Sequence, residues 1–306
     1  MTHQPSFSHA EFAAKKKITR REKFLARMEA VLPWAKLLAV IQPFYPKGER
    51  GRPPVGLERM LRVCFLQQWY GLADEALEDA LYDSQAMRGF ARIDLAAEGV
   101  PDAITLLKFR RLLETHDLCK GRFTAINADL TACGLLLRAG TLVDATLIAA
   151  PPSTKNQEKK RDPERHQTRK GNPWCFGMKA HIGADRDSQL VHPVVVTAAN
   201  VADLTQPAER LHGQEPQVHA DAGYTGVEKR AEMVALERTI DWQMARKRGP
   251  IKTMAAGAEK ATLKAVEQAK AAVRAFVEPP CHIRKNIFRE QWGEHSIMKG
   301  AKNSGT

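Results

Sequence analysis

Residues 141–148 read TLVDATLI, a run of β-branched and apolar residues that a single acid, Asp144, interrupts. Such a run is typical of a short buried strand. Apolar residues alternate again over 176–182, and a DRDS turn at 185–188 leads into a second apolar run over 190–197. The pattern predicts a first strand followed by a β-hairpin.

Two more strands and a long helix follow these three strands. The fourth strand is expected at 217–220 and the fifth at 242–245. An amphipathic helix is expected over 259–278, with Leu263, Val266, Val273 and Phe276 or Val277 facing inward. A three-stranded meander followed by further strands and helices predicts an α/β domain over residues 139–306.

The first part of the chain has a different periodicity. Apolar residues recur at three- and four-residue steps over 57–69 and predict a helix that Gly71 closes. Asp74 and Asp102 are expected to cap two further helices. Residues 1–138 are therefore predicted to be an all-helical domain. Its short helices fit a helix-turn-helix-like DNA reader and an ordinary helical bundle equally well.

The composition limits the class of protein. The 306 residues (34.1 kDa) carry 47 Lys and Arg against 35 Asp and Glu, for a net charge of +12 and a pI near 9.6. This balance favours a polyanionic partner, with nucleic acid first. The sequence has neither a long apolar run nor a secretion signal, so we expect a cytoplasmic protein. Five scattered cysteines without C-x-x-C argue against a disulfide framework and a cysteine zinc site.

The positive charge is concentrated in two stretches. Residues 1–50 carry a net charge of +6 and residues 155–170 a net charge of +4. A charge run is often only a solvated surface, but phosphate contacts require such local excess. Trp174 follows the second stretch and either stacks on an unpaired base or caps the sheet. The expected DNA contacts, including those on the exposed side of the helix after Asp102, are Lys15, Lys16, Lys17, Arg20, Arg21, Lys108, Arg110, Arg111, Lys159, Lys160, Arg169 and Lys170.

Two acids stand in or directly after predicted strands. Asp144 interrupts the first strand, and Asp221 follows the fourth. Either acid alone is more often a turn or capping residue. If the two strands are neighbours, both carboxylates lie at one edge of the sheet, and Glu278 at the end of the long helix completes a metal site. Oxygen ligands without Cys or His favour two Mg²⁺ or Mn²⁺ ions, which can promote displacement at a phosphodiester.

Two basic residues accompany the glutamate. Arg274 lies one helical turn before Glu278, where its guanidinium can pair with the carboxylate or hold a phosphate. Lys285 lies seven residues after Glu278, beyond Pro279 and Pro280.

At these residues the sequence resembles bacterial insertion-sequence transposases of the insertion-sequence-five family. The resemblance runs from about Lys15 to Glu278. It rests on long motifs, among them LVDATLIAAPPSTKN, VTAANVADLTQ, HADAGYTGVEKR and RAFVE, and on the N-terminal GRPPVGLERMLRVCFLQQWYGLADEALEDALYD.

The resemblance implies a ribonuclease-H-like mixed sheet with a D-D-E triad, preceded by a helical domain that binds the ends of the element. The triad falls on Asp144, Asp221 and Glu278, and the supporting Arg and Lys fall on Arg274 and Lys285. Ala271 stands where the family has a tyrosine. The residues after Glu278 also depart from the family pattern, so we expect the catalytic domain to be truncated at its C-terminus.

The first interpretation is therefore a transposase that binds the terminal inverted repeats of its own element, nicks the strand ends with water and joins them to target DNA. The family implies a homo-oligomer in the synaptic complex, DNA as the partner, and a location at the bacterial nucleoid. The second interpretation is a decayed, non-catalytic DNA-binding remnant. The third is a metal-dependent nuclease on the same fold without strand transfer.

Overall fold

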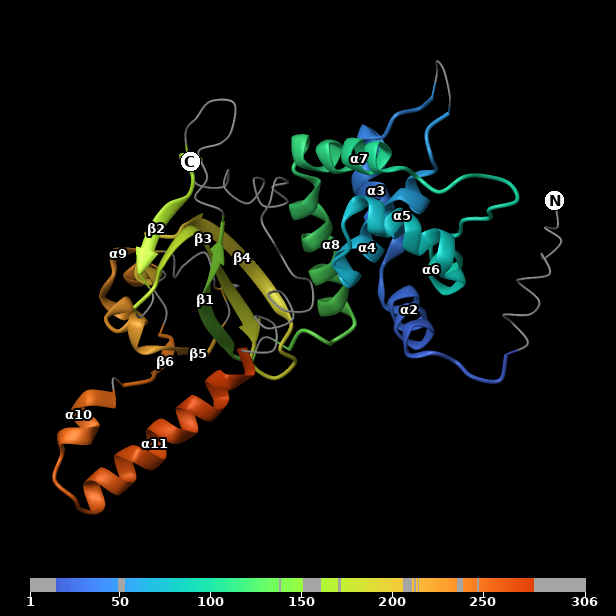
Figure 1. Cartoon of the computed structure of the whole chain (residues 1–306). Helices are drawn as coiled ribbons and strands as arrows, with labels where there is room; N and C mark the ends of the chain where they lie inside the picture. Colours follow the sequence, from blue (N-terminus) through green and yellow to red (C-terminus); the bar gives the residue numbers. More distant parts are fainter. Residues whose placement is uncertain are drawn as a thin grey trace. The chain divides into compact units, whose positions relative to one another are not determined.

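The structure of the chain is a computed structural model. It describes residues 15–48, 53–137, 139–150, 161–169, 172–205, 211, 213, 215–235, 239–246 and 248–277. The chain forms two compact units, Met1–Ile126 and Asn127–Thr306 (Figure 1). The division falls inside a helix, and the domain limits 1–138 and 139–306 expected from the sequence stay a prediction. Among the residues that the structure describes, no helix is long and apolar enough to cross a membrane.

The first unit is helical, as the sequence predicts. Its elements are α2 (Arg20–Val31), α3 (Trp34–Ile41), η1 (Gln42–Phe44), α4 (Leu57–Tyr70), α5 (Asp74–Asp83), α6 (Gln85–Ala91), α7 (Ala103–Thr115) and α8 (Leu118–Ala132), the last of which continues into the second unit. Helix α4 ends at Gly71 in the left-handed conformation. The side chain of Asp102 caps α7 by accepting a hydrogen bond of 2.7 Å from the Thr105 amide.

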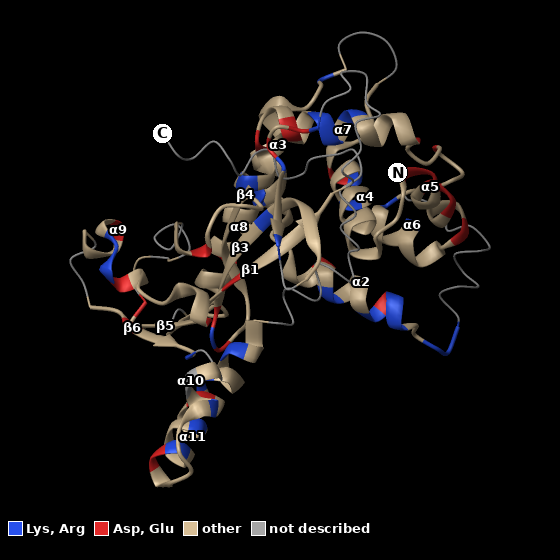
Figure 2. Ribbon diagram, turned by 60° about the vertical axis from the view of Figure 1, so that its left-hand side comes forward, with Lys and Arg blue, Asp and Glu red and all other residues tan. Residues whose placement is uncertain are grey.

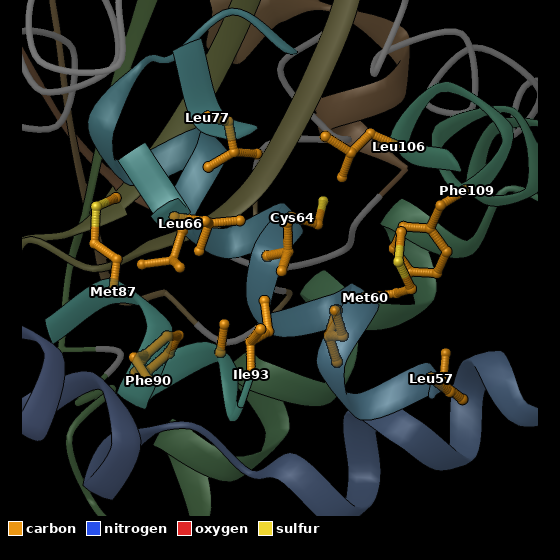
Figure 3. Close-up of a cluster of buried hydrophobic side chains, with 14 of the residues drawn as sticks. Leu57, Met60, Cys64, Leu66, Leu77, Met87, Phe90, Ile93, Leu106 and Phe109 are labelled. Carbon is orange, nitrogen blue, oxygen red and sulfur yellow. The ribbon is translucent and has the colours of Figure 1, made fainter. Parts of the chain in front are cut away.

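One apolar core holds these helices together. Figure 3 shows Leu57, Met60, Cys64 and Leu66 of α4 converging with residues of α5, α6 and α7. Met60, Leu66 and Leu77 are at most 1% exposed. This packing stabilises the helices more than their sequence propensities do, because isolated helices of this length are marginal in water.

Asp74 does not cap α5, contrary to the sequence-based expectation. Ala73 is the N-cap residue, and the Asp74 carboxylate instead accepts hydrogen bonds from Arg110 (Nη2–Oδ2 2.6 Å) and Gln67 (Nε2–Oδ1 2.6 Å). Arg110 also donates to Gln67 Oε1 at 3.0 Å and is 8% exposed. The expectation that Arg110 lies on the exposed side of its helix is therefore wrong: its guanidinium joins α7 to α5 and α4 inside the unit.

The described residues of the second unit form a six-stranded mixed sheet. Its strands are β1 (Thr141–Ala149), β2 (His166–Arg169), β3 (Trp174–Asp185), β4 (Val191–Ala198), β5 (Gln217–Ala220) and β6 (Asp241–Met244). The expected strands are all present, and β2 is an addition that the sequence pattern did not predict.

The strand order is that of a ribonuclease-H-like sheet. β3 pairs antiparallel with both β1 and β4, whereas β5 runs parallel to β1 and β6 runs parallel to β5. The sheet is thus ordered β4-β3-β1-β5-β6, with β2 added on β3. This confirms the predicted fold class, an α/β catalytic domain with a mixed sheet preceded by helices.

Short helices and one long helix complete the unit. They are η2 (Asp203–Thr205), η4 (Ala222–Tyr224), η5 (Val227–Lys229), α9 (Ala231–Val234), α10 (Arg248–Thr253), α11 (Ala258–Arg274) and η6 (Ala275–Val277). Helix α11 lies beside α10, and the C-terminal end of α11 contacts the sheet (Figure 1). The expectation that Val266 faces inward is wrong, since this residue is 45% exposed, whereas Val277 is 1% exposed.

Candidate active site

Of the two aspartates expected in the site, Asp144 lies in β1 and Asp221 directly follows the neighbouring strand β5. β1 and β5 pair in parallel register, with Thr141 opposite Val218 and Leu142 opposite His219. Continued for two residues at the same offset, this register sets Asp144 level with Asp221, which directly follows β5. Paired residues of parallel strands point to the same face of a sheet. At this offset Asp144 and Asp221 would face the same side of the sheet, and both residues are partly exposed.

The chain turns sharply at Asp221. Asp221 is the N-cap residue of η4, and its Oδ1 accepts a hydrogen bond of 2.9 Å from the Gly223 amide. A Cβ atom at position 223 would lie 2.9 Å from that same oxygen, so a larger residue there would require the Asp221 carboxylate to shift. Tyr224, 1% exposed, anchors the turn in an apolar cluster with Val143 of β1. The Asp221 carboxylate is thus fixed beside the strand that carries Asp144.

The C-terminal end of α11 packs on the same face of the sheet. Val277 and Val273 share an apolar cluster with Leu142 of β1 and Ile182 of β3. Leu142 and Asp144 are two residues apart in a strand, so their side chains lie on one face. Arg274 is half-buried in the last turn of α11. Glu278 and Lys285, the other two residues predicted for this site, lie outside the described residues.

His219 is a structural neighbour of the site. Its side chain is 6% exposed, and its Nε2 lies 3.0 Å from Gln217 Oε1. Burial and the nearby Arg186 lower the pKa of His219 below its ordinary value, so the imidazole is neutral at pH 7. His219 is therefore a packing and hydrogen-bonding residue of β5.

A further polar cluster was not predicted from the sequence. Lys179 Nζ on β3 lies 3.0 Å from Asp203 Oδ1 of η2 and donates to the Val201 carbonyl at 2.8 Å. His181, which is fully buried, lies with its Nε2 2.8 Å from Thr197 Oγ1. η2 in turn contacts η4, which Asp221 caps. The alternating polar residues of a strand that otherwise looks buried, Lys179 and His181, are the signal that could have revealed this cluster.

The predicted DNA contacts have different environments. Lys16, Lys17, Arg20 and Arg21 are exposed in or before α2, and Figure 2 shows the basic residues of that segment in blue. Lys15 instead forms an ion pair of 2.6 Å with Glu22. Arg21 donates to Ser84 Oγ at 3.1 Å. Of the remaining residues, Lys108, Arg111 and Arg169 are exposed and Arg110 is buried, whereas Lys159, Lys160 and Lys170 lie outside the described residues.

The donor set matches a hard divalent cation. The side chains expected in the site are carboxylates, and Mg²⁺ and Mn²⁺ prefer carboxylate oxygens. In the part of the chain that the structure describes, no three His, Cys, Asp or Glu side chains come together as a metal site. Glu278, the predicted third ligand, lies outside the residues searched, and the metal-binding roles of Asp144, Asp221 and Glu278 stay a prediction.

A ribonuclease-H-like sheet with one aspartate in β1 and another directly after the parallel strand β5 is typical of enzymes that process nucleic acids. Residues 12–112 match a family model described as Transposase domain (DUF772), and residues 136–293 match one described as Transposase DDE domain. The chain therefore belongs to the DDE transposases of insertion sequences. No solved structure matches the chain significantly. Membership of the insertion-sequence-five family stays a prediction.

Proposed function

We propose that this DDE transposase belongs to the insertion-sequence-five family, binds the terminal inverted repeats of its own insertion sequence, and carries out strand cleavage followed by strand transfer. The observation that supports the proposal is the parallel register of β1 and β5, because the offset of the pairs Thr141–Val218 and Leu142–His219, continued for two residues, would bring Asp144 level with Asp221. Two carboxylates in that relationship are suited to share divalent ions at a phosphodiester.

In the proposed site Asp144, Asp221 and Glu278 hold two Mg²⁺ or Mn²⁺ ions. The bound ions supply activation of the attacking oxygen and stabilisation of the leaving oxygen. Asp221 keeps its orientation through the Gly223 amide, which leaves its second carboxylate oxygen as a ligand. Arg274, one turn before Glu278, and Lys285 act as phosphate or carboxylate partners.

Binding of the element ends is assigned to the basic residues of the helical unit. Lys16, Lys17, Arg20 and Arg21 are exposed in or before α2, and Lys108 and Arg111 are exposed on α7. The basic segment 155–170 contributes contacts that do not depend on sequence. Neutralising about five phosphates gives a log–log slope of affinity against salt of roughly −4 to −5. A homo-oligomer bridges the two ends in the synaptic complex.

The test uses labelled DNA that flanks the coding sequence on either side, together with an unlabelled target plasmid. Purified protein is incubated with these DNAs in Mg²⁺ or Mn²⁺, and cleaved ends and joined products are separated on a denaturing gel. A scrambled end of the same length is the specificity control, and a chelator is the control for metal dependence. The proposal expects cleavage of authentic ends and joined product.

The alternative interpretations predict different outcomes of the same assay. A non-catalytic remnant binds the ends and leaves them intact in every metal. A nuclease cleaves the ends, or any DNA, without joining them to the plasmid. The burial of Val277 beside Leu142 favours the catalytic interpretation, because it anchors the chain that leads into Glu278 on the face that carries Asp144.

A further inference from the structure

Trp174 at the start of β3 is unusually exposed. Its side chain is 68% exposed, whereas tryptophan is buried to a large extent on average in folded proteins. Trp34 and Trp69 pack against the core of the helical unit, and Trp242 packs in the cluster around Val143. A large flat ring that contributes so little to packing is available for a ligand.

Trp174 belongs to a strip of aromatic and basic side chains. In the β2–β3 pair Arg169 lies opposite Trp174 and Gln167 lies opposite Phe176. Because paired residues share a face, Arg169, Trp174 and Phe176 lie on one side of this hairpin. The Arg161 guanidinium lies 5.7 Å from the centre of the Phe176 ring, within the range of a cation–π contact. We call Arg161, Arg169, Trp174 and Phe176 the aromatic strip.

The aromatic strip lies on the face of the sheet that carries Asp144. Asp144 pairs with Ile182 of β3, and residues of even number from Ile182 back to Trp174 share that face. Eight residues of extended strand span about 26 Å. The strip therefore begins beyond the end of β1 and continues away from the carboxylates on their own side.

Gly177 allows β3 and β1 to approach each other closely where the aromatic strip begins. It pairs with Ala149, the last residue of β1, and has a φ of 157°. A Cβ atom at this position would lie 2.0 Å from the Ile148 carbonyl oxygen. A larger residue would push β3 away from β1 and shift the strip relative to Asp144.

The charge and shape of the strip favour a nucleic-acid strand. The segment 155–170 that contains β2 carries a net charge of +4, which suits a phosphate backbone. An indole ring stacks on a base only when that base is unpaired and accessible, and such stacking tolerates any base. A duplex keeps the faces of its bases stacked inside, so it offers the indole no base face to stack on.

We propose that the aromatic strip binds unpaired bases of single-stranded DNA that leads to the site of Asp144, with Trp174 as the stacking residue. The proposal rests on the proposed function, since it assigns a DNA path to the same site. It adds a contact for melted DNA to the duplex contacts of the helical unit.

The test measures binding of the full chain to fluorescent oligothymidylate of 20 nucleotides and to a duplex of the same length, without metal. Trp174→Ala should weaken binding of the single strand by about 5- to 150-fold, the range for loss of one base–aromatic stack. Duplex binding should change less than twofold. Trp174→Phe should keep most of the affinity. Leu137→Ala is the matched control, because Leu137 is 57% exposed and lies outside the strip.

Tryptophan emission gives a second measurement on the same proteins. Oligothymidylate should quench the emission of the wild type more than that of Trp174→Phe, because stacking brings the base against the indole. Equal single-strand affinity in wild type and Trp174→Ala would overturn the proposal, as would an equal loss for single strand and duplex. Tighter binding of oligouridylate than of oligothymidylate would assign the strip to RNA instead. None of these measurements depends on cleavage, so failure of the proposed function is distinguishable from failure of the strip.

Discussion

Val277 of η6 and Leu142 of β1 are buried in one apolar cluster, so the end of the α11 segment is anchored on the strand that carries Asp144. Helix α11 has no buried residue of its own, and the anchoring depends on its last turn and on η6. The residue that follows Val277 is Glu278. The cluster thus relates the two segments that bear the first and the third predicted metal ligand.

Val277→Ala should slow end cleavage by about a hundredfold, because a displacement of about 1 Å at a catalytic group can have that effect. Loss of the buried methyl groups should also destabilise the unit by about 1 to 2 kcal/mol. Phe276→Ala, at a neighbouring residue that is 49% exposed, is the control and should change neither quantity. Cleavage under single-turnover conditions and urea unfolding measure the two effects. Equal cleavage rates for Val277→Ala and Phe276→Ala would show that the packing of Val277 on Leu142 does not affect cleavage.

Arg110 and Arg111 are neighbours in sequence with opposite environments, and their substitutions should separate stability from DNA binding. Arg110→Ala leaves the Asp74 carboxylate without its guanidinium and should lower the free energy of unfolding by about 2 to 4 kcal/mol. Arg111→Ala should leave stability within about 0.5 kcal/mol and should reduce the salt slope of DNA binding by about 1. Chemical unfolding and a salt titration provide the measurements. A stable Arg110→Ala variant with weakened DNA binding would contradict this assignment.

Arg62 should make the stability of the helical unit depend on pH. It is 1% exposed and donates to Glu29 (Nη2–Oε1 2.8 Å) and Glu58 (Nη2–Oε1 2.9 Å). Its hydrogen bonds lower the pKa of Glu29 from 4.5. Because the folded-state pKa is depressed, the stabilisation is present above pH 4.5 and is lost as the pH falls through the folded-state pKa.

Arg62→Met should therefore lower the free energy of unfolding by about 2 to 3 kcal/mol at pH 7. This difference from wild type should shrink as the pH falls toward 3. Arg92→Met is the control. Arg92 contacts the same two carboxylates but is 57% exposed, so its loss should cost only about 0.5 kcal/mol. Thermal unfolding between pH 3 and pH 7 measures both. A difference that does not vary with pH would show that Arg62 acts through packing alone.

The Lys179–Asp203 ion pair should support the turn at Asp221 from outside the site. Asp203→Asn should lower the cleavage rate by about tenfold and leave end binding unchanged, as expected for a residue that orients a ligand. The exchanged pair Lys179→Asp with Asp203→Lys should recover part of the rate. Asp187→Asn, which removes a surface pair with Arg186, is the control. Cleavage by Asp203→Asn at the wild-type rate would show that the Lys179–Asp203 ion pair has no role in cleavage.

The strands were predictable from the sequence because their apolar residues alternate or run together. β5 occupies the predicted 217–220, and β1 extends the predicted 141–148 by one residue. The neighbouring placement of β1 and β5 was posed only as a condition, because strand pairing depends on contacts between residues far apart in sequence. Their parallel pairing satisfies that condition.

The structure differs from the sequence-based predictions where contacts between residues distant in sequence decide the outcome. Arg110 looks exposed in a pattern of LKFRRLLE, and only the placement of α5 brings Asp74 to it. Strand β2 reads HQTR, which has no apolar periodicity, and it forms because β3 extends beyond β1 and offers an edge. Val266 fits the helical period but is exposed, since only the last turn of α11 and η6 pack on the sheet.

The cleavage rate of Asp144→Asn on labelled element ends in Mg²⁺ tests the central claim most directly. Wild type and variant are compared at protein concentrations that saturate the DNA, with binding measured on the same samples. The account predicts a loss of cleavage of at least about a thousandfold, as when a catalytic side chain is removed, with end binding unchanged or tighter because one negative charge near the phosphate is gone. Cleavage by Asp144→Asn at the wild-type rate would contradict it.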